Sequence, residues 1–320
     1  YPPSPAVRDA LEAFRYDEMR LYPAPDASVL TEAIAEVYGT VPERVFVGVG
    51  SDDVLSMAFM TFFDSDRPVL FPDITYSFYD VWADVYRIPY KQIPLRGGFR
   101  IDPNDYAQEN GGIIFPNPNA PTGVLESTEM IEGIVRANPG SVVIIDEAYI
   151  DFGGKSVLPL TEKYDNLLVV QTFSKSRSMA GMRIGFAVGS ERLIKYMNDV
   201  KFSVNSYTMN RVTIACGAAA VRDREYLRET CGRIVATREN AKTELKKRGF
   251  EFPDPMSNFI FAKPTLVSAQ TLFDELRKRR IFVRYWNKPG ISDHLRITIG
   301  TDDEMRQLYA AIDDIQGGIK

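Results

Sequence analysis

The sequence has few of the residues on which several common catalytic and metal sites depend. Its 320 residues include one histidine, His294, and two cysteines, Cys216 and Cys231. A single histidine argues against a Ser-His-Asp triad and against a histidine-rich metal site. The two cysteines show no metal-binding or redox spacing and suit a reducing compartment. We therefore expect a cytoplasmic protein that holds no metal ion.

The sequence also lacks an excess of positive charge and any long apolar run. Lysine and arginine number 38 against 43 aspartate and glutamate residues, a net charge of 38 − 43 = −5. Without a basic tract we expect no nucleic-acid partner. No apolar stretch is long enough to cross a bilayer, and YPPSP at the start is not typical of a signal peptide. Since no methionine precedes Tyr1, we expect the chain to begin partway into a longer protein.

Apolar runs alternate with helical patterns over the first two thirds of the chain. Continuous apolar strands separated by helices predict an α/β fold, in which a mostly parallel sheet is flanked by helices on both faces. Strands are expected at residues 44–49, 68–71, 112–115, 141–146, 167–171 and 184–188, and helices at 52–63, 77–87 and 127–137.

The pattern changes after about residue 205. Long helical stretches at 209–221 and 224–248 precede short strands at 258–262, 281–283 and 295–299. Because 320 residues exceed one ordinary core, we expect a smaller α+β domain here. The predicted division is a large domain at 20–205 and a small domain made of 1–19 and 206–320.

One apolar run, LLVV, ends in hydroxyl and cationic side chains. Thr172, Ser174 and Lys175 follow it, and Arg183 comes later in the same segment. Ligands of a parallel sheet collect beyond the carboxyl ends of its strands, and two hydroxyls with an arginine could hold a phosphate. Lys175 could then form a Schiff base with a carbonyl compound. A solvated basic loop explains these residues equally well on their own.

Two other strand ends carry acidic residues. Asp146 ends the apolar run SVVIID, where an unpaired carboxylate is costly, so it needs a cationic or N–H partner. A pyridinium nitrogen would serve, and a structural cap or a metal carboxylate is the alternative. Ser51 and Asp52 follow GVG at the expected start of a helix, whose free amides could bind an anion. A plain N-cap explains that pair better when it is taken alone.

Two arginines lie in or next to strands of the C-terminal region. Arg296 lies inside LRITIG, and Arg284 follows IFV. An arginine in a strand usually faces solvent, but either residue could orient a substrate that carries a carboxylate.

Four motifs taken together resemble a known family. NPNAPTG (117–123), DEAYIDF (146–152), FSKSRSMAGMRIG (173–185) and LRITIGT (295–301) stand in the order and spacing typical of pyridoxal-phosphate-dependent aminotransferases of fold type I. The resemblance covers essentially the whole chain. YIDF, LYP (21–23) and VRYWNK (283–288) are most similar to the class II family of histidinol-phosphate aminotransferases.

The resemblance implies an activity. It is the transamination of L-histidinol phosphate with 2-oxoglutarate to imidazole-acetol phosphate and glutamate, a step of histidine biosynthesis. Pyridoxal 5′-phosphate would be bound to Lys175 as a Schiff base, in a homodimer with active sites at the subunit interface. The alternatives are a lyase similar to threonine-phosphate decarboxylase and an aminotransferase for aromatic or other amino acids.

The resemblance also implies a role for individual residues. Lys175 would hold the cofactor and move the substrate proton, Asp146 would pair with the pyridine nitrogen, and Tyr149 would bond to the ring's phenolic oxygen. Tyr76 would stack on the ring. The phosphate would be held by Ser51, Asp52, Thr172, Ser174 and Arg183, with Tyr22 from the neighbouring subunit. The substrate would be held by Arg296 at its carboxylate, by Arg284 at its phosphate, and by Asn258.

The sequence departs from the family pattern in two places. The family commonly has asparagine before PTG, where this chain has Ala120, with Asn119 one position earlier. Either Asn119 takes the contact to the cofactor ring, or Tyr149 makes it alone. The segment that usually precedes the YPPSP-like start is also absent. Of the remaining residues, we expect Arg177 to be solvated, His294 to be structural and Trp286 to pack near Arg284.

Overall fold

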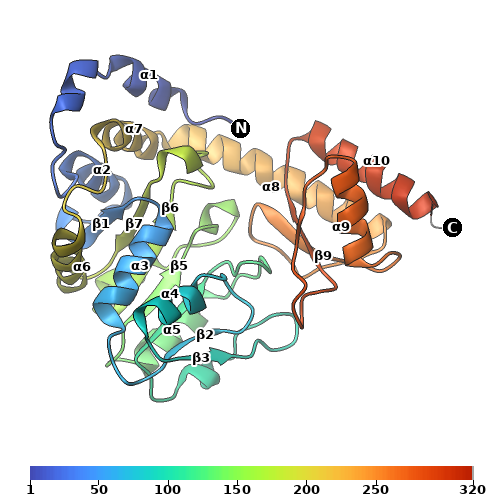
Figure 1. Ribbon diagram of the computed structural model, residues 1–320, viewed down its shortest axis with the longest axis horizontal. Helices are drawn as coiled ribbons and strands as arrows, with labels where there is room; N and C mark the ends of the chain where they lie inside the picture. Colours follow the sequence, from blue (N-terminus) through green and yellow to red (C-terminus); the bar gives the residue numbers. More distant parts are fainter. Residues whose placement is uncertain (319–320) are drawn as a thin grey trace.

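The computed structural model describes residues 1–318, which form two β-sheets covered by helices (Figure 1). The larger sheet has seven strands. Six of them were indicated by the apolar runs, whereas β3 has the sequence YKQI and lies mostly exposed at the sheet edge, so its pattern carries no strand signal. The strands are β1 (Val45–Gly48), β2 (Val69–Pro72), β3 (Tyr90–Ile93), β4 (Gly112–Pro116), β5 (Val143–Asp146), β6 (Leu167–Thr172) and β7 (Gly185–Val188).

The larger sheet is mostly parallel, as expected. Its strand order is β1-β7-β6-β5-β4-β2-β3. The pairs from β3 through β6 are parallel, and only β7 runs antiparallel to its two neighbours, β1 and β6. The carboxyl ends of β4, β5 and β6 therefore meet at one edge of the sheet, where a ligand is expected to bind.

Helices cover both faces of this sheet. One core lies under α2 (Ser28–Tyr38), α5 (Thr128–Ala137) and α7 (Arg211–Arg222). The other lies under α3 (Ser51–Phe62), α4 (Tyr79–Tyr86) and α6 (Glu191–Val204). Along β5, Val143 and Ile145 join the first core and Ile144 joins the second. Because side chains alternate along a strand, Asp146 belongs to the face under α3 and α4, and Glu147 to the opposite face.

The smaller sheet has the order β10-β11-β9-β8, and all its pairs are antiparallel. Figure 1 shows the long helix α8 running from α7 toward this sheet, with α9 and α10 beside it. Within residues 1–318 no helix combines the length and the apolar character that a membrane crossing needs. The elements are α8 (Arg224–Lys247), β8 (Phe250–Glu251), β9 (Phe259–Pro264), α9 (Ala269–Lys278), β10 (Arg284–Tyr285), β11 (Leu295–Thr298) and α10 (Asp302–Gly318).

The strand expected at 281–283 is wrong. The chain leaves α9 through Arg280, which has a left-handed φ of 60°, and sheet pairing begins only at Arg284, opposite Arg296. Ile281 and Val283 pack against the core of the smaller sheet, whereas Phe282 is largely exposed. The apolar run IFV thus connects a helix to a strand without hydrogen bonding in the sheet.

The N-terminal helix α1 (Pro5–Ala13) packs against α7. Val7 and the apolar face of α7 belong to the same core cluster as the larger sheet. The division of the chain at residues 19 and 205 stays a prediction. The packing of α1 and α7 places both helices against the larger sheet, although the predicted division assigns them to the small domain.

Short 3₁₀ helices occur in the connections between the main elements. Two of them, η4 and η6, lie in the loops that follow β5 and β6. The 3₁₀ helices are η1 (Tyr16–Arg20), η2 (Pro42–Arg44), η3 (Pro103–Tyr106), η4 (Ile150–Phe152), η5 (Leu158–Glu162) and η6 (Ala180–Met182).

Strand β7 approaches the start of α3 so closely that only glycine fits between them. A Cβ on Gly185 would lie 2.3 Å from the backbone nitrogen of Ser51 and 2.4 Å from the carbonyl carbon of Gly50. Both atoms belong to the backbone and cannot rotate away, so the contact fixes the position of the helix start relative to the sheet.

We expect Gly185→Ala to lower the free energy of unfolding by about 1–3 kcal/mol, the usual cost of an overpacked core. Gly133→Ala is the matched control, because a Cβ there meets no atom within 4 Å in the interior of α5; it should be neutral or stabilise by up to about 1 kcal/mol. Urea unfolding of both variants measures the difference. Equal stabilities would contradict the close approach.

Candidate active site

The carboxylate of Asp146 is buried at the carboxyl end of β5. It accepts hydrogen bonds from the Tyr79 hydroxyl at 3.2 Å and from the Ala148 backbone N–H at 3.1 Å. Burial raises the pKa of Asp146 to about 6, and these two donors limit the rise. A carboxylate with only two neutral donors still gains from a cationic partner. Asp146 therefore fits a positively charged nitrogen.

Tyr79 is a site residue that the sequence reasoning missed. It is fully buried in α4, and both its burial and the nearby Asp146 raise its pKa, so it stays a hydrogen-bond donor. The aromatic run TYSFYDVW predicts packing against the core, but it does not show which tyrosine hydroxyl points toward the end of the strand. Its ring packs edge-on against Tyr76, with centroids 5.7 Å apart.

The start of α3 forms an anion cradle with Arg183. Gly50 is the N-cap, with a left-handed φ of 92° and no side-chain capping bond, so the first amides of the helix are open to a ligand. The Arg183 guanidinium lies against Gly50, where a Cβ would come within 2.4 Å of Nη2, and it lies 3.8 Å from Asp52. Ser51, Asp52 and Arg183 are therefore close together, as expected.

Tyr76 connects this cradle to the strand end. Its hydroxyl donates a hydrogen bond to Asp52 Oδ1 at 2.8 Å. Burial and the Asp52 carboxylate both raise the pKa of Tyr76, so the phenol remains protonated. The bond turns one Asp52 oxygen toward Tyr76, while the other oxygen faces Arg183. Asp52 thus balances the arginine while the amide nitrogens of the helix start remain available.

Thr172, Ser174 and Lys175 follow one another at the end of β6. The Thr172 hydroxyl donates to the Ile184 carbonyl at 3.3 Å and accepts from the Ser174 backbone N–H at 3.1 Å, which shapes the turn. Lys175 Nζ lies 5.5 Å from the centre of the Tyr149 ring. Tyr149 itself is held by edge-on packing against Phe259, with centroids 4.9 Å apart. The amine and the phenol ring therefore share one corner of the site.

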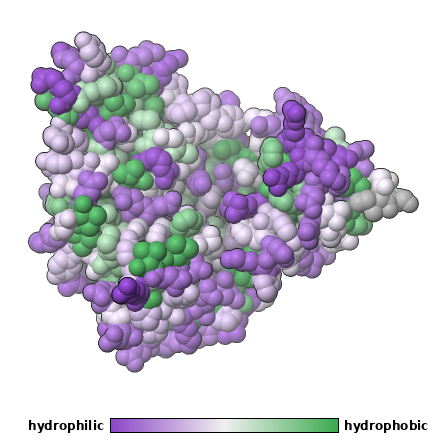
Figure 2. Space-filling view, in the orientation of Figure 1, coloured by the Kyte–Doolittle hydropathy of each residue, from purple (hydrophilic) through white to green (hydrophobic). Residues whose placement is uncertain are grey.

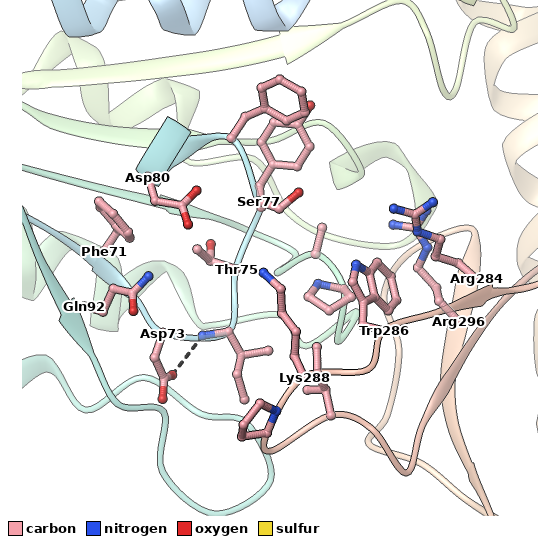
Figure 3. A pocket seen from close by; sticks show the side chains of 17 residues that line it. Phe71, Asp73, Thr75, Ser77, Asp80, Gln92, Arg284, Trp286, Lys288 and Arg296 are labelled. Atoms are coloured by element: carbon pink, nitrogen blue, oxygen red, sulfur yellow. Dashed lines mark hydrogen bonds between the residues drawn. The ribbon is translucent and has the colours of Figure 1, made fainter. Parts of the chain in front are cut away.

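A cavity of about 310 Å³ lies between the segment that follows β2 and the residues around β10 and β11; its lining includes neither Lys175 nor Tyr149. Tyr76, Arg284 and Arg296 line it, together with Trp286 and Lys288. Figure 3 shows the guanidinium groups of both arginines side by side, and Lys288 extending toward Thr75 on the opposite wall. Lys288 was not among the expected residues, although it lies in the motif VRYWNK.

The Arg296 guanidinium is flanked by two aromatic rings. Its Cζ lies 5.0 Å from the Phe259 ring centre and 5.4 Å from that of Trp286. Its Nε is buried without a hydrogen-bond partner among residues 1–318. Arg284 lies opposite Arg296 in the strand pair and also contacts Trp286, at 5.4 Å. Two neighbouring cations with unused donors favour an anionic ligand.

The two predicted asparagines lie in different settings. Asn119 is buried, and its side-chain amide donates to the Ile74 carbonyl and to Thr122 Oγ1, both at 3.0 Å. Its Oδ1 is buried without a partner in the described part of the chain. Asn258 is half-buried, and its backbone carbonyl accepts a hydrogen bond from the Ile299 backbone N–H at 2.8 Å. Both amide N–H groups of Asn119 are used within the protein and its unpaired Oδ1 can only accept a hydrogen bond, so the contact expected between Asn119 and the cofactor ring stays a prediction.

Tyr22 is not brought to this site. It is 78% exposed and packs against Tyr207, with ring centroids 4.7 Å apart. Both tyrosines line a separate hollow of about 670 Å³ near η1. In Figure 2 hydrophobic residues gather at the α1 end of the molecule, and the exposed apolar residues of η1 and the segment after it are Tyr16, Met19, Leu21 and Tyr22.

Arg177 was expected to be solvated, and this is wrong. It is only 7% exposed, because its guanidinium lies over the Phe173 ring and beside Asp151 and Tyr38. The partners come from distant segments, which the local charge pattern SKSRS does not show. His294 stacks on Phe261, with centroids 4.4 Å apart, in keeping with a structural role.

Comparison with known proteins confirms the resemblance. The model of the family "Aminotransferase class I and II" matches residues 1–312. Histidinol-phosphate aminotransferase of Lactococcus lactis subsp. cremoris (strain MG1363) is 51% identical over 305 residues, 95% of this chain and 86% of the relative. Histidinol-phosphate aminotransferase 1 of Hydrogenovibrio crunogenus is 50% identical over 315 residues, 98% and 88% of the two chains.

Solved structures agree on the fold. Histidinol-phosphate aminotransferase from Sinorhizobium meliloti in complex with pyridoxal-5′-phosphate superimposes with a TM-score of 0.91 at 23% identity, over 100% of this chain and 89% of that chain. The enzyme from Clostridium acetobutylicum gives a TM-score of 0.89 at 22% identity, over 99% and 97%. Identities this low compare the fold alone, and both sheets lie within the matched region.

The buried carboxyl of Asp146 predicts a pH dependence of stability for the cofactor-free protein. Its pKa is raised from 3.8 to about 6 on folding, so the folded protein binds more protons than the unfolded chain in this window. The free energy of unfolding should therefore fall as the pH rises from about 4 to 6, by up to about 3 kcal/mol. Urea unfolding at several pH values measures this slope.

The variant Asp146→Asn should reduce the slope between pH 4 and 6, and the part that remains there comes from Glu147. Glu147→Gln is the comparison, because burial raises the pKa of Glu147 to about 7; this variant should lose the fall in stability between pH 6 and 7 and keep the Asp146 contribution between pH 4 and 6. A slope that survives in Asp146→Asn unchanged would show that the carboxylate is already paired in the cofactor-free protein.

Proposed function

We propose that this chain, which belongs to the aminotransferase class I and II family, transfers an amino group between L-histidinol phosphate and 2-oxoglutarate. Its cofactor is pyridoxal 5′-phosphate. The observation that carries the proposal is the set of groups along one sheet edge: the Lys175 amine, the buried Asp146 carboxylate, and an open helix start with Arg183. The high identity to enzymes named histidinol-phosphate aminotransferase supports the substrate.

The residues present fit each polar part of the cofactor. The buried carboxylate of Asp146 suits the pyridine nitrogen in its protonated form, because a charge-assisted bond keeps both groups ionised. The amides at the start of α3, with Arg183, suit the phosphate. Lys175 offers an amine for the carbonyl carbon. The unpaired Oδ1 of Asn119 is a further polar atom in the strand-end loops.

When bound, pyridoxal phosphate supplies a carbonyl that accepts the amino group and a ring that withdraws electrons from the reacting carbon. The protein's residues do the rest. Asp146 keeps the ring nitrogen protonated, and Tyr79 and Ala148 orient its carboxylate. Lys175 carries the proton to and from the substrate carbon. Tyr149, whose ring centre lies 5.5 Å from Nζ, limits the volume in which that amine moves.

The cavity lined by Arg284 and Arg296 would hold the substrates. Arg296 would bind the α-carboxylate of glutamate and 2-oxoglutarate, which its unpaired buried Nε and its two flanking rings favour. Arg284 would bind the phosphate of the second substrate, with Lys288 on the same wall. Asn258 lies immediately before β9 and would contact the substrate. An amino acid that carries no second anionic group would leave Arg284 and Lys288 without a counter-charge.

The active form is a homodimer in this proposal. Tyr22 is highly exposed and lies outside the site of its own chain, so it can reach a cofactor only in a second subunit. Exposed Tyr16, Met19 and Leu21 beside it suit burial in such an interface. We also propose a cytoplasmic location, which the free state of both cysteines supports.

Replacing Lys175 by alanine should lower amino transfer by about a thousandfold or more, since proton transfer by a positioned side chain contributes on that scale. The variant should also lose the visible absorption band of lysine-bound cofactor. Glutamate formed from L-histidinol phosphate and 2-oxoglutarate measures the activity. Lys195→Ala, an exposed lysine paired with Asp199 on α6, is the control and should behave as the wild type. Full activity of Lys175→Ala would refute the assignment.

A panel of substrates separates the alternatives. Threonine phosphate should release no carbon dioxide, and phenylalanine with 2-oxoglutarate should give less than about a hundredth of the rate, because it leaves Arg284 and Lys288 without an anionic partner. Carbon dioxide release would favour the decarboxylase, and faster turnover of phenylalanine would favour an aromatic aminotransferase.

Mixed dimers test the shared site. Lys175→Ala and Tyr22→Ala should each be impaired as pure proteins. Mixing them under conditions that exchange subunits should recover about a quarter of wild-type activity, since half of the dimers are mixed and each has one complete site. The mass of the complex in sedimentation is the parallel measurement. Absence of recovery in a mixture shown to contain mixed dimers would place Tyr22 outside the partner's site.

A further inference from the structure

The loop that carries Lys175 has a buried ion pair directly behind it. Arg177, two positions after the lysine, has a side chain only 4% exposed, and its Nη1 lies 3.6 Å from Asp151 Oδ2. Ser176, between the two residues, also donates a hydrogen bond to Asp151 Oδ2. Two consecutive residues of the lysine loop are therefore fastened to one carboxylate.

Asp151 belongs to the loop that carries Tyr149. It is the second residue after Tyr149 and lies in η4, which Tyr149 caps. The contacts of Asp151 with Ser176 and Arg177 therefore join the Tyr149 loop to the Lys175 loop. The same two loops bring Lys175 Nζ to 5.5 Å from the centre of the Tyr149 ring.

A series of hydrogen bonds connects this contact between the two loops to residues at the ends of β5 and β6. Arg177 Nη2 donates to the Tyr38 hydroxyl at 3.3 Å, which donates to Gln171 Oε1 at 2.7 Å. Gln171 Nε2 donates to Glu147 Oε2 at 2.8 Å. Glu147 also accepts the Val157 N–H at 2.7 Å, which closes the loop between Glu147 and Val157. These hydrogen bonds thus link Glu147 and Gln171, the neighbours of Asp146 and Thr172, to Arg177, two positions after Lys175.

Stability alone does not account for this arginine. Its Nε and Nη1 are buried without hydrogen-bond partners among the described residues, and the groups that face it are Tyr38 from α2, Asp151 from η4 and Cys231 from α8. A buried pair with incomplete hydrogen bonding is commonly no more stable than an apolar packing of similar volume. Phe173 beneath the guanidinium would suit such an apolar side chain.

We propose that the Arg177–Asp151 pair is a positioning device that holds the Lys175 amine at its working place relative to Tyr149 and the cofactor carbonyl. The proposal rests on the proposed function, because it takes Lys175 as the cofactor-binding amine. Neither member of the pair contacts the anion cradle of Ser51, Asp52 and Arg183 in the ion-pair and hydrogen-bond pattern of residues 1–318. The pair therefore acts on the covalent step and not on phosphate binding.

The test separates these two steps with two probes. Pyridoxal 5′-phosphate is added to the cofactor-free protein, and the visible band reports its capture by Lys175. Pyridoxine 5′-phosphate has the same ring and phosphate but no carbonyl, so its dissociation constant reports the cradle alone. The variants are Arg177→Met, Arg177→Lys, Asp151→Asn and the double variant Arg177→Met with Asp151→Asn. Arg222→Met, which breaks the exposed pair with Glu36, is the matched control.

Each single variant should slow capture by about tenfold to a hundredfold, the scale on which small misplacements of a reacting group act. The dissociation constant of pyridoxine 5′-phosphate should stay within about twofold of the wild type, and the double variant should capture no more slowly than the slower single variant, because residues acting as one unit are not additive. Arg177→Lys keeps the charge but loses the planar fork, so it should be slowed as well. Arg222→Met should match the wild type.

Four results would overturn the proposal. Unchanged capture in the single variants would show that the pair does not position the amine. Opposite effects of Arg177→Met and Asp151→Asn would show that their charges act through space instead of through geometry. A parallel loss of pyridoxine 5′-phosphate binding would show a general structural role. A wild-type protein that binds pyridoxine 5′-phosphate but captures no pyridoxal 5′-phosphate would refute the role of Lys175 itself, and with it the proposed function.

Discussion

The burial of one carboxylate, Asp146, is the constraint on which the site depends. Burial raises its pKa to about 6, and its two hydrogen bonds come from neutral donors. A charge held in this way is stabilised by a cation, and among residues 1–318 Lys175 acts on Asp146 through space. In the proposed function the pyridinium of the cofactor would be the direct partner, so cofactor binding would relieve the cost of burying this carboxylate.

Because side chains alternate along β5 and β6, the residues proposed to bind the cofactor and the residues that hold the neighbouring loops lie on opposite faces of the sheet. Asp146 and Thr172 continue the sheet face of Ile144 and Val170, which lies under α3 and α4. Glu147 and Gln171 continue the opposite face, which lies under α2 and α7. The first pair faces the proposed cofactor site. The second pair hydrogen-bonds to each other at 2.8 Å and leads through Tyr38 to Arg177. In the proposed function one face of these strand ends would hold the ligand, while the side chains of the other face hydrogen-bond to the loops that carry Lys175 and Tyr149.

The strand ends could be predicted from the sequence because apolar runs define buried strands, and parallel strands bring their carboxyl ends together. That reasoning correctly grouped Asp146 with the Lys175 loop. It failed for Arg177, whose burial depends on Tyr38, 139 positions away, and on Asp151. It also missed Tyr79, because which hydroxyl of an aromatic run faces a strand depends on helix packing. The local sequence gives the position of a charged residue in the chain, but it does not show which distant residues pack around that charge in the folded protein.

The pairing of Arg284 with Arg296 across two strands explains why the cavity suits doubly anionic ligands. Neighbouring cations repel each other, and Trp286 lies 5.4 Å from both guanidinium groups, where its ring face offsets part of that repulsion. Full compensation requires negative charge from the ligand. Glutamate and 2-oxoglutarate each bring two carboxylates, and L-histidinol phosphate brings one phosphate with up to two charges. In the proposed function the same pair of arginines would therefore serve both half-reactions, with the reacting carbon beside Lys175 in each.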